Sequence, residues 1–207
     1  MVPSVFGSAR QRLANLALAG WIAADAVRIA QLADRDGAWT IDAAIILALA
    51  AAAIFVLVRP APAQQEGSPV TVAVALAAAF FPLLYLLLPP LASLATATIV
   101  TQWAAVVVML VSTLALGRNY SILPQYRWLV RHGPYAYVRH PLYASYLVFD
   151  GALALQHPSV LAVALWIAEA ILFDWRARRE EAFLARSSED YVNYMSRVRW
   201  RFVPHLL

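Results

Sequence analysis

Residues 41–58 read IDAAIILALAAAAIFVLV, and Asp42 is the one charged residue among these eighteen positions. As an α-helix the stretch would be about 27 Å long, at 1.5 Å per residue. That length approaches the roughly 30 Å of hydrocarbon in a bilayer, and a run this apolar is typical of a transmembrane helix. The stretch therefore predicts a membrane span.

Similar stretches surround it, at residues 13–32, 70–88 and 98–116. Helix-ending residues follow the four stretches, in DRDG, RPAPAQQEGSP, PP and GRNYS. Two shorter apolar runs, 142–155 and 159–173, would each cover about 20 to 23 Å. They are interpreted as spans five and six, with a shallow hairpin as the alternative.

The composition supports a membrane protein. Of the 207 residues, 62% are hydrophobic and 14% are charged, whereas about a quarter are charged in soluble domains. We therefore predict an all-α fold, a single polytopic integral membrane helical bundle over residues 1–207. Residues 1–116 would hold four spans, and residues 117–207 a loop, a helical hairpin and a tail. Because the chain has no cysteine, disulfides and thiolate metal sites are excluded.

The arginines predict the orientation, because basic loops of membrane proteins are retained in the cytoplasm. With six spans and a cytoplasmic N-terminus, fourteen of the sixteen arginines fall on the cytoplasmic side. This favours an integral protein of a prokaryotic inner (plasma) membrane with both termini in the cytoplasm. In residues 174–207, apolar and charged residues interleave, so we expect a cytoplasmic amphipathic helical tail. Its last helix would run from about Glu189 to Arg197.

The loop at 117–140 contains four arginines and no acid, and leads through GPYAYVRHP into span five. Pro141 suits the first position of a helix, where its missing N–H is harmless. Free backbone donors and the positive end of the helix dipole would then lie beside Arg139 and His140. This pattern favours a site for a carboxylate or phosphate. A positive-inside anchor with interfacial aromatic residues is the alternative.

Glu180 and Glu181 follow span six. If spans five and six form a hairpin, this acid pair returns to the same membrane face as Arg139. Alternatively, the two acids form helix-surface ion pairs with Arg176 and Arg178.

The tail mixes aromatic residues with arginines, a pattern typical of membrane-interface anchors that could also close a pocket. These residues are Tyr191, Tyr194, Arg197, Arg199, Trp200 and Arg201. We expect no nucleic-acid partner for so hydrophobic a chain.

Two further acids, Asp150 and Glu169, lie inside apolar runs. Acids there are costly and are candidates for function, although each could instead reach a headgroup or an internal hydrogen bond. Asp25 and Arg28 are spaced for an internal ion pair in span one. No metal-ligand spacing is present.

Three blocks, GPYAYVRHPLY (133–143), REEAFL (179–184) and DYVNYMSRVRWRFVP (190–204), together resemble the isoprenylcysteine carboxyl methyltransferase and phospholipid methyltransferase families. The resemblance covers roughly residues 115–204. It implies a membrane-embedded enzyme that uses S-adenosylmethionine and methylates a lipophilic acceptor. That acceptor would be an isoprenylcysteine-type carboxylate or a lipid headgroup, so the expected partners are a lipophilic or lipid-modified substrate and membrane lipid.

The resemblance also implies site residues. Those associated with the cofactor would be Arg139, His140, Pro141, Tyr143, Tyr135, Gly117, Glu180, Glu181 and Tyr194. Methyl transfer needs no nucleophilic side chain, so the catalytic candidates are Arg199, to orient a carboxylate acceptor, and Glu180, to assist an amine. Relatives commonly have glycine where this chain has Ser145, and a side chain there would narrow the site or alter the packing of the helix.

Two other functions remain open. Sterol-reductase-like membrane enzymes that use NADPH have a related C-terminal layout, but they tend to have asparagine where this chain has Leu142. A non-enzymatic membrane scaffold would need the arginines only to fix its topology.

Overall fold

The computed structural model describes residues 9–36, 39–88, 96–157 and 159–204. Its helices are α1 (Ala9–Asp36), α2 (Trp39–Val58), α3 (Pro69–Phe80), α4 (Thr96–Leu116), α5 (Pro141–Gln156), α6 (Val160–Ser187) and α7 (Glu189–Arg197). Short 3-10 helices are η1 (Phe81–Leu87), η2 (Gly117–Asn119) and η3 (Gly133–Ala136), and the strands are β1 (Gln64–Gln65) and β2 (Gln125–Tyr126). The described part is mostly helical, which confirms the predicted all-α class.

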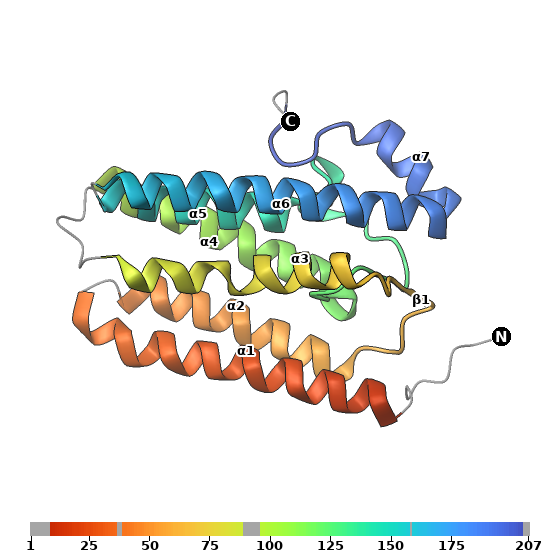
Figure 1. Ribbon diagram of the computed structural model, residues 1–207, viewed down its shortest axis with the longest axis horizontal. Coiled ribbons are helices and arrows are strands. Elements are labelled where there is room, and N and C mark those ends of the chain that lie inside the picture. The colour runs from red at the N-terminus through yellow and green to blue at the C-terminus, as the bar shows by residue number, and fades with distance from the viewer. Residues whose placement is uncertain (1–8, 37–38, 89–95, 158, 205–207) are drawn as a thin grey trace.

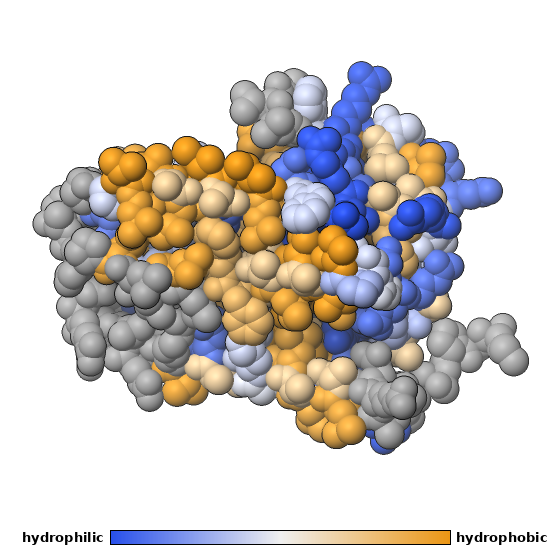
Figure 2. All heavy atoms as spheres, in the orientation of Figure 1, coloured by the Kyte–Doolittle hydropathy of each residue, from blue (hydrophilic) through white to orange (hydrophobic). Residues whose placement is uncertain are grey.

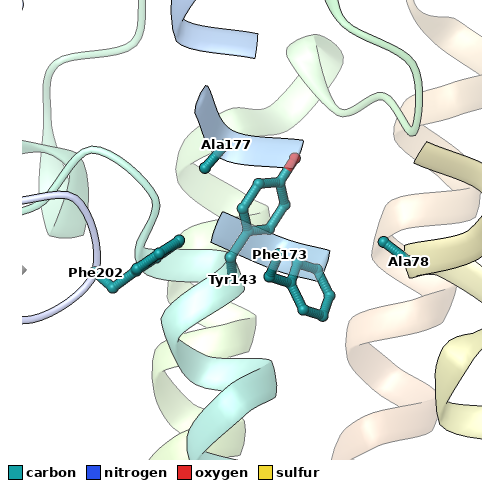
Figure 3. Close-up of a cluster of buried hydrophobic side chains, with 5 residues drawn as sticks. All are labelled: Ala78, Tyr143, Phe173, Ala177 and Phe202. Atoms are coloured by element: carbon teal, nitrogen blue, oxygen red, sulfur yellow. The ribbon is translucent and has the colours of Figure 1, made fainter. Parts of the chain in front are cut away.

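The long helices run roughly parallel or antiparallel, with α7 set across one end (Figure 1). Along the bundle, α1 packs on α2, α2 on α4, α4 on α5, α5 on α6 and α6 on α3. Small side chains allow close approach between α1 and α2, where Ala19 and Ala52 are buried beside Ile22 and Val56. A second cluster joins α3, α5, α6 and the tail through Ala78, Tyr143, Phe173, Ala177 and Phe202 (Figure 3).

The surface of the bundle is divided into an apolar and a polar part. Hydrophobic residues cover much of the helices, and hydrophilic residues gather at the end that holds β1 and α7 (Figure 2). Large apolar side chains such as Leu47, Ile54 and Val100 are more than half exposed, as lipid-facing residues are. Among the described residues, α2 and α4 are the helices with both the length and the composition to cross a membrane.

The predicted third span is wrong as one continuous α-helix. Residues 70–88 begin as α3, but the α-helix ends at Phe80 and the chain continues as the 3-10 helix η1. Pro82 accounts for the break, because proline lacks an N–H and its ring clashes with the preceding turn. The predicted ion pair of Asp25 with Arg28 involves the Arg28 side chain, which lies outside the described part.

The loop after α4 is tied to the loop after α2. In the antiparallel pair of β1 and β2, Gln64 lies opposite Tyr126. Arg127 donates from Nε to the Pro60 carbonyl oxygen at 2.9 Å. Arg59 donates to the Tyr120 carbonyl oxygen at 2.8 Å and to Asn15 Oδ1 at 2.7 Å. Burial lowers the pKa of Arg59 to about 10, so this anchor keeps its charge at neutral pH.

Candidate functional site

A pocket lies at the polar end of the bundle, between the loop after α4, the start of α5, the end of α6, and α7. Its cavity volume is about 110 Å³. Its lining residues are Leu116, Asn119, Ser121, Leu123, Gln125, Tyr126, Trp128, Leu129, Val130, Tyr135, Arg139, His140, Leu142, Tyr143, Glu180, Leu184, Tyr191 and Tyr194.

The start of α5 is fixed by proline and by the tail. Pro141 occupies the first turn of the helix, as predicted, and His140 precedes it with non-helical backbone angles. The backbone N–H groups of Arg139 and His140 donate to the carbonyl oxygens of Trp200 and Arg201, at 2.9 and 2.8 Å. The tail is therefore part of the structure that holds this block in place.

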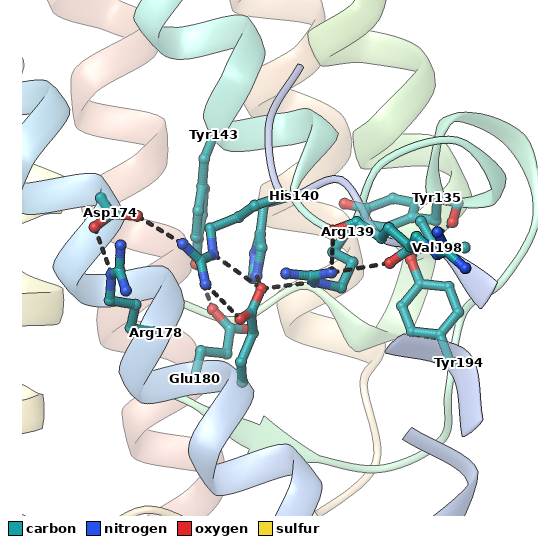
Figure 4. Close-up of polar contacts among 12 residues, drawn as sticks. Tyr135, Arg139, His140, Tyr143, Asp174, Arg178, Glu180, Tyr194 and Val198 are labelled. Atoms are coloured by element: carbon teal, nitrogen blue, oxygen red, sulfur yellow. Dashed lines mark hydrogen bonds and ion pairs between the residues drawn. The ribbon is translucent and has the colours of Figure 1, made fainter. Parts of the chain in front are cut away.

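Glu181 is the centre of a buried ion-pair network. Figure 4 shows Arg139 and His140, two of its partners, close to Glu180. Glu181 Oε1 accepts from Arg139 Nε at 2.8 Å and lies 3.2 Å from His140 Nε2. Its Oε2 accepts from Arg201 Nη2 at 2.9 Å. Burial raises the pKa of the Glu181 carboxyl, but the hydrogen bonds from His140, Arg201 and Arg139 outweigh it and hold that pKa well below its ordinary value. Glu181 thus stays ionised and holds three groups together.

Arg139 also joins this network to the tail backbone. Its Nη1 donates to the carbonyl oxygens of Val198 and Arg199, at 2.9 and 2.6 Å. Arg201 makes a second ion pair from Nη1 to Asp174 Oδ1 at 2.8 Å. The Arg139 guanidinium and the acid pair therefore lie together at one end of the bundle, as predicted from a hairpin of spans five and six.

Glu180 faces the pocket rather than the network. The Tyr143 hydroxyl donates to Glu180 Oε2 at 2.7 Å. The Tyr143 ring stacks on His140, with centroids 5.1 Å apart, and the Arg176 guanidinium lies 4.9 Å from its centroid. Tyr143 thus orients the pocket carboxylate, while the Arg176 cation and the His140 ring hold the tyrosine.

The alternative in which both acids pair with arginines on their own helix is wrong. Arg178 pairs with Asp174 at 2.6 Å, and Arg176 donates to the Ile122 carbonyl oxygen at 2.6 Å. Both acids of the doublet instead contact residues far away in the sequence.

Buried tyrosines form another wall of the pocket. The Tyr194 hydroxyl donates to the Tyr135 carbonyl oxygen at 2.7 Å, which ties α7 to η3. The rings of Tyr191 and Tyr194 lie with centroids 5.7 Å apart. Burial raises the pKa of all three hydroxyls, so they are neutral at physiological pH.

The structure places six of the predicted site residues in the pocket lining and four outside it. The lining residues are Tyr135, Arg139, His140, Tyr143, Glu180 and Tyr194. Pro141 and Glu181 lie just behind them. Gly117 has a φ of +51°, a backbone conformation that favours glycine, and it is not a lining residue. The Arg199 side chain is exposed, and its backbone oxygen is what contacts Arg139.

Ser145 does not narrow the pocket. Its side chain is buried, its hydroxyl donates to the Leu142 carbonyl oxygen at 2.7 Å, and it is not a lining residue. The expectation that this serine would restrict the site is therefore wrong.

Two parts of the site were missed from the sequence. The first is the identity of the residues by which the loop 117–140, itself expected at the cofactor site, lines the pocket, among them Leu123, Trp128 and Leu129. The second is the role of Arg201, whose partner Glu181 lies twenty positions away and could not be identified from spacing.

Residues 94–186 match the model of the isoprenylcysteine carboxyl methyltransferase (ICMT) family. The match includes Arg139, Tyr143 and the acid pair, and it ends before α7 and the tail block 190–204. No curated protein matches the chain closely enough for comparison. Residues 94–186 of this protein therefore carry the pattern of the ICMT family, and the family resemblance of the first two blocks, 133–143 and 179–184, is confirmed.

Proposed function

We propose that the protein is a membrane-embedded methyltransferase that uses S-adenosylmethionine to methylate a lipophilic acceptor. The observation that carries this proposal is the pocket, to which the family-matched segment contributes Arg139, Tyr143 and Glu180. The family match supports a membrane methyltransferase, and the apolar helices α2 and α4 support a membrane location.

The polar groups of the pocket fit a zwitterionic nucleoside. Glu180 suits an amine or the ribose hydroxyls, and Arg139 suits a carboxylate. The faces of Tyr135, Tyr191 and Tyr194 suit an adenine ring or a sulfonium cation. When bound, S-adenosylmethionine supplies a methyl group on a positively charged sulfur.

Glu181 supports the site without binding the cofactor. Both of its oxygens are taken by Arg139, His140 and Arg201. We therefore assign it the role of a positioning residue that fixes the block 139–143 against the tail.

Reaction in this pocket depends on positioning and on exclusion of water. For a carboxylate acceptor, a cation such as Arg199 orients the head and no general base is needed, provided that its exposed side chain turns toward the pocket. For an amine acceptor, Glu180 takes the proton that the amine must lose before it attacks. The apolar end of the acceptor is proposed to enter from the bilayer between helices, and the cofactor from the cytoplasm.

Binding of S-adenosylhomocysteine to the purified protein tests the proposal. We expect Glu180→Gln to weaken this binding at least tenfold, about 1.4 kcal/mol. Glu189→Gln is the matched control, because Glu189 is an exposed acid outside the pocket lining. Thermal unfolding of each variant shows whether it is folded.

Other outcomes identify the rival functions. Preferential binding of NADPH would indicate a reductase, and binding of neither ligand would indicate a scaffold. Arg139→Ala is a poorer probe than Glu180→Gln, because it removes a partner of Glu181 and loosens the tail as well.

A further inference from the structure

Two acids that the pocket does not use lie buried in the helical hairpin. Asp150 of α5 is 6% exposed, and Glu169 of α6 is 0% exposed. Neither lines the pocket. Glu169 precedes Glu180 by eleven residues, about 16 Å along the helix.

The two acids contact each other from facing helices. Asp150 and Glu169 lie close enough to interact, on helices α5 and α6, which pack against each other. The Tyr85 hydroxyl, from η1, donates to Glu169 Oε2 at 3.3 Å. Glu169 Oε1 is shielded from solvent and receives no hydrogen bond from an N–H or a tyrosine, serine or threonine O–H of the described residues.

No described arginine or histidine forms an ion pair with either acid. Within the described part of the chain, the titratable groups that act on the pair are the two acids themselves and Tyr85. Two carboxylates offer only acceptors, so they form a hydrogen bond with each other only when one of them holds a proton. A charged carboxylate without an ion-pair partner between two apolar helices also costs free energy, and binding of a proton removes both the charge and that cost.

We propose that Asp150 and Glu169 share a bound proton and act as a positioning pair, which joins α5 to α6 and, through Tyr85, to η1. In this arrangement the carboxyl O–H of Asp150 donates to Glu169 Oε1, which has no other hydrogen-bond donor among the described residues.

The pair lies in the hairpin that carries Tyr143 and Glu180 at its polar end. One further bond sets the same alignment, from Trp166 Nε1 to the Leu147 carbonyl oxygen at 2.8 Å. Because slippage of α6 along α5 would separate the Tyr143 hydroxyl from Glu180, the carboxyl pair fixes the geometry of the pocket from a distance.

Infrared spectroscopy of the reconstituted protein at neutral pH tests for the proton. We expect a carbonyl stretching band of a protonated carboxylic acid, which shifts when the protein is transferred to D₂O. Asp150→Asn and Glu169→Gln should each shift this band, and the double variant should abolish it. Asp174→Asn is the control, because Asp174 pairs with two arginines and should leave the band unchanged. Absence of any band that responds to positions 150 and 169 would overturn the proposal.

Stability provides a second readout that does not depend on what the pocket binds. Glu169→Gln keeps a neutral hydrogen-bonding group and should unfold within about 2 °C of wild type, whereas Glu169→Leu should unfold several degrees lower. The leucine leaves the Tyr85 hydroxyl and Asp150 without partners. If glutamine destabilises the protein as much as leucine does, the neutral pair is rejected.

Discussion

Glu181 neutralises two arginines in a site from which water is largely excluded. Glu181→Gln keeps the shape of the side chain but leaves Arg139 and Arg201 without that charge. We expect the free energy of unfolding in detergent to fall by about 3 to 5 kcal/mol. Glu180→Gln is the matched control. The Glu180 carboxyl accepts a hydrogen bond from the Tyr143 hydroxyl and forms no ion pair with a described arginine, so this substitution should lower the free energy of unfolding by less. Equal losses in both variants would contradict the assigned roles.

The same carboxyl makes stability depend on pH. The unfolded carboxyl takes up a proton near its ordinary value of 4.5, whereas the folded one stays ionised to lower pH. Below about pH 4.5 the unfolded state binds more protons than the folded state does, so the free energy of unfolding should fall as the pH falls. Unfolding of wild type and of Glu181→Gln, measured from neutral pH downward, should show this slope in the wild type and a smaller slope in the variant.

Tyr143 connects the family block to the pocket carboxylate. Tyr143→Phe removes only the hydroxyl that donates to Glu180, and hydrogen bonds to charged groups contribute about 1.5 to 3 kcal/mol. We expect binding of S-adenosylhomocysteine to weaken about tenfold or more. Tyr137→Phe, at a position 73% exposed, serves as the control. If Tyr143→Phe binds S-adenosylhomocysteine as tightly as wild type does, the Tyr143 hydroxyl is not needed to orient the Glu180 carboxylate.

At the scale of elements, the hairpin depends on a close contact at Gly151. A Cβ atom there would lie 2.9 Å from Trp166 Nε1, whose hydrogen bond reaches the backbone of α5. Gly151→Ala should therefore lower the free energy of unfolding by about 1 to 3 kcal/mol. Gly20→Ala, where a Cβ meets nothing within 4 Å, should be neutral or stabilising. Comparable losses at both positions would rule out this contact as the cause.

Elements with strong local signals could be predicted from the sequence. The apolar run 41–58 coincides with α2, and the expected last helix, Glu189 to Arg197, coincides with α7. The apolar composition of residues 70–88 predicts one continuous span, but Pro82 ends the α-helix at Phe80. In the site, local motifs identified Arg139, Tyr143 and Glu180. The contacts of Arg201 and the identity of the pocket-lining residues in the loop 117–140 depend on tertiary folding, which spacing along the chain does not encode.

At the scale of the molecule, six spans with cytoplasmic termini remain a prediction that labelling can test. The chain has no cysteine, so a single introduced cysteine gives no background. Gly67→Cys lies in an exposed loop expected in the cytoplasm, and Val160→Cys, at a position 88% exposed, lies at the opposite turn. An impermeant maleimide should label Val160→Cys in intact cells and Gly67→Cys only after permeabilisation. Labelling of both from the same side would exclude this topology.

The bonds between the tail and the start of α5 have a consequence for biosynthesis. A ribosome makes Arg139 and His140 some sixty residues before their partners Trp200 and Arg201. If α1 to α6 enter the bilayer as predicted, they can do so while Glu181 still lacks its bond to Arg201. The pocket is thus the last feature to mature, and translation that stops shortly after α6 would leave an inserted protein without a finished binding site.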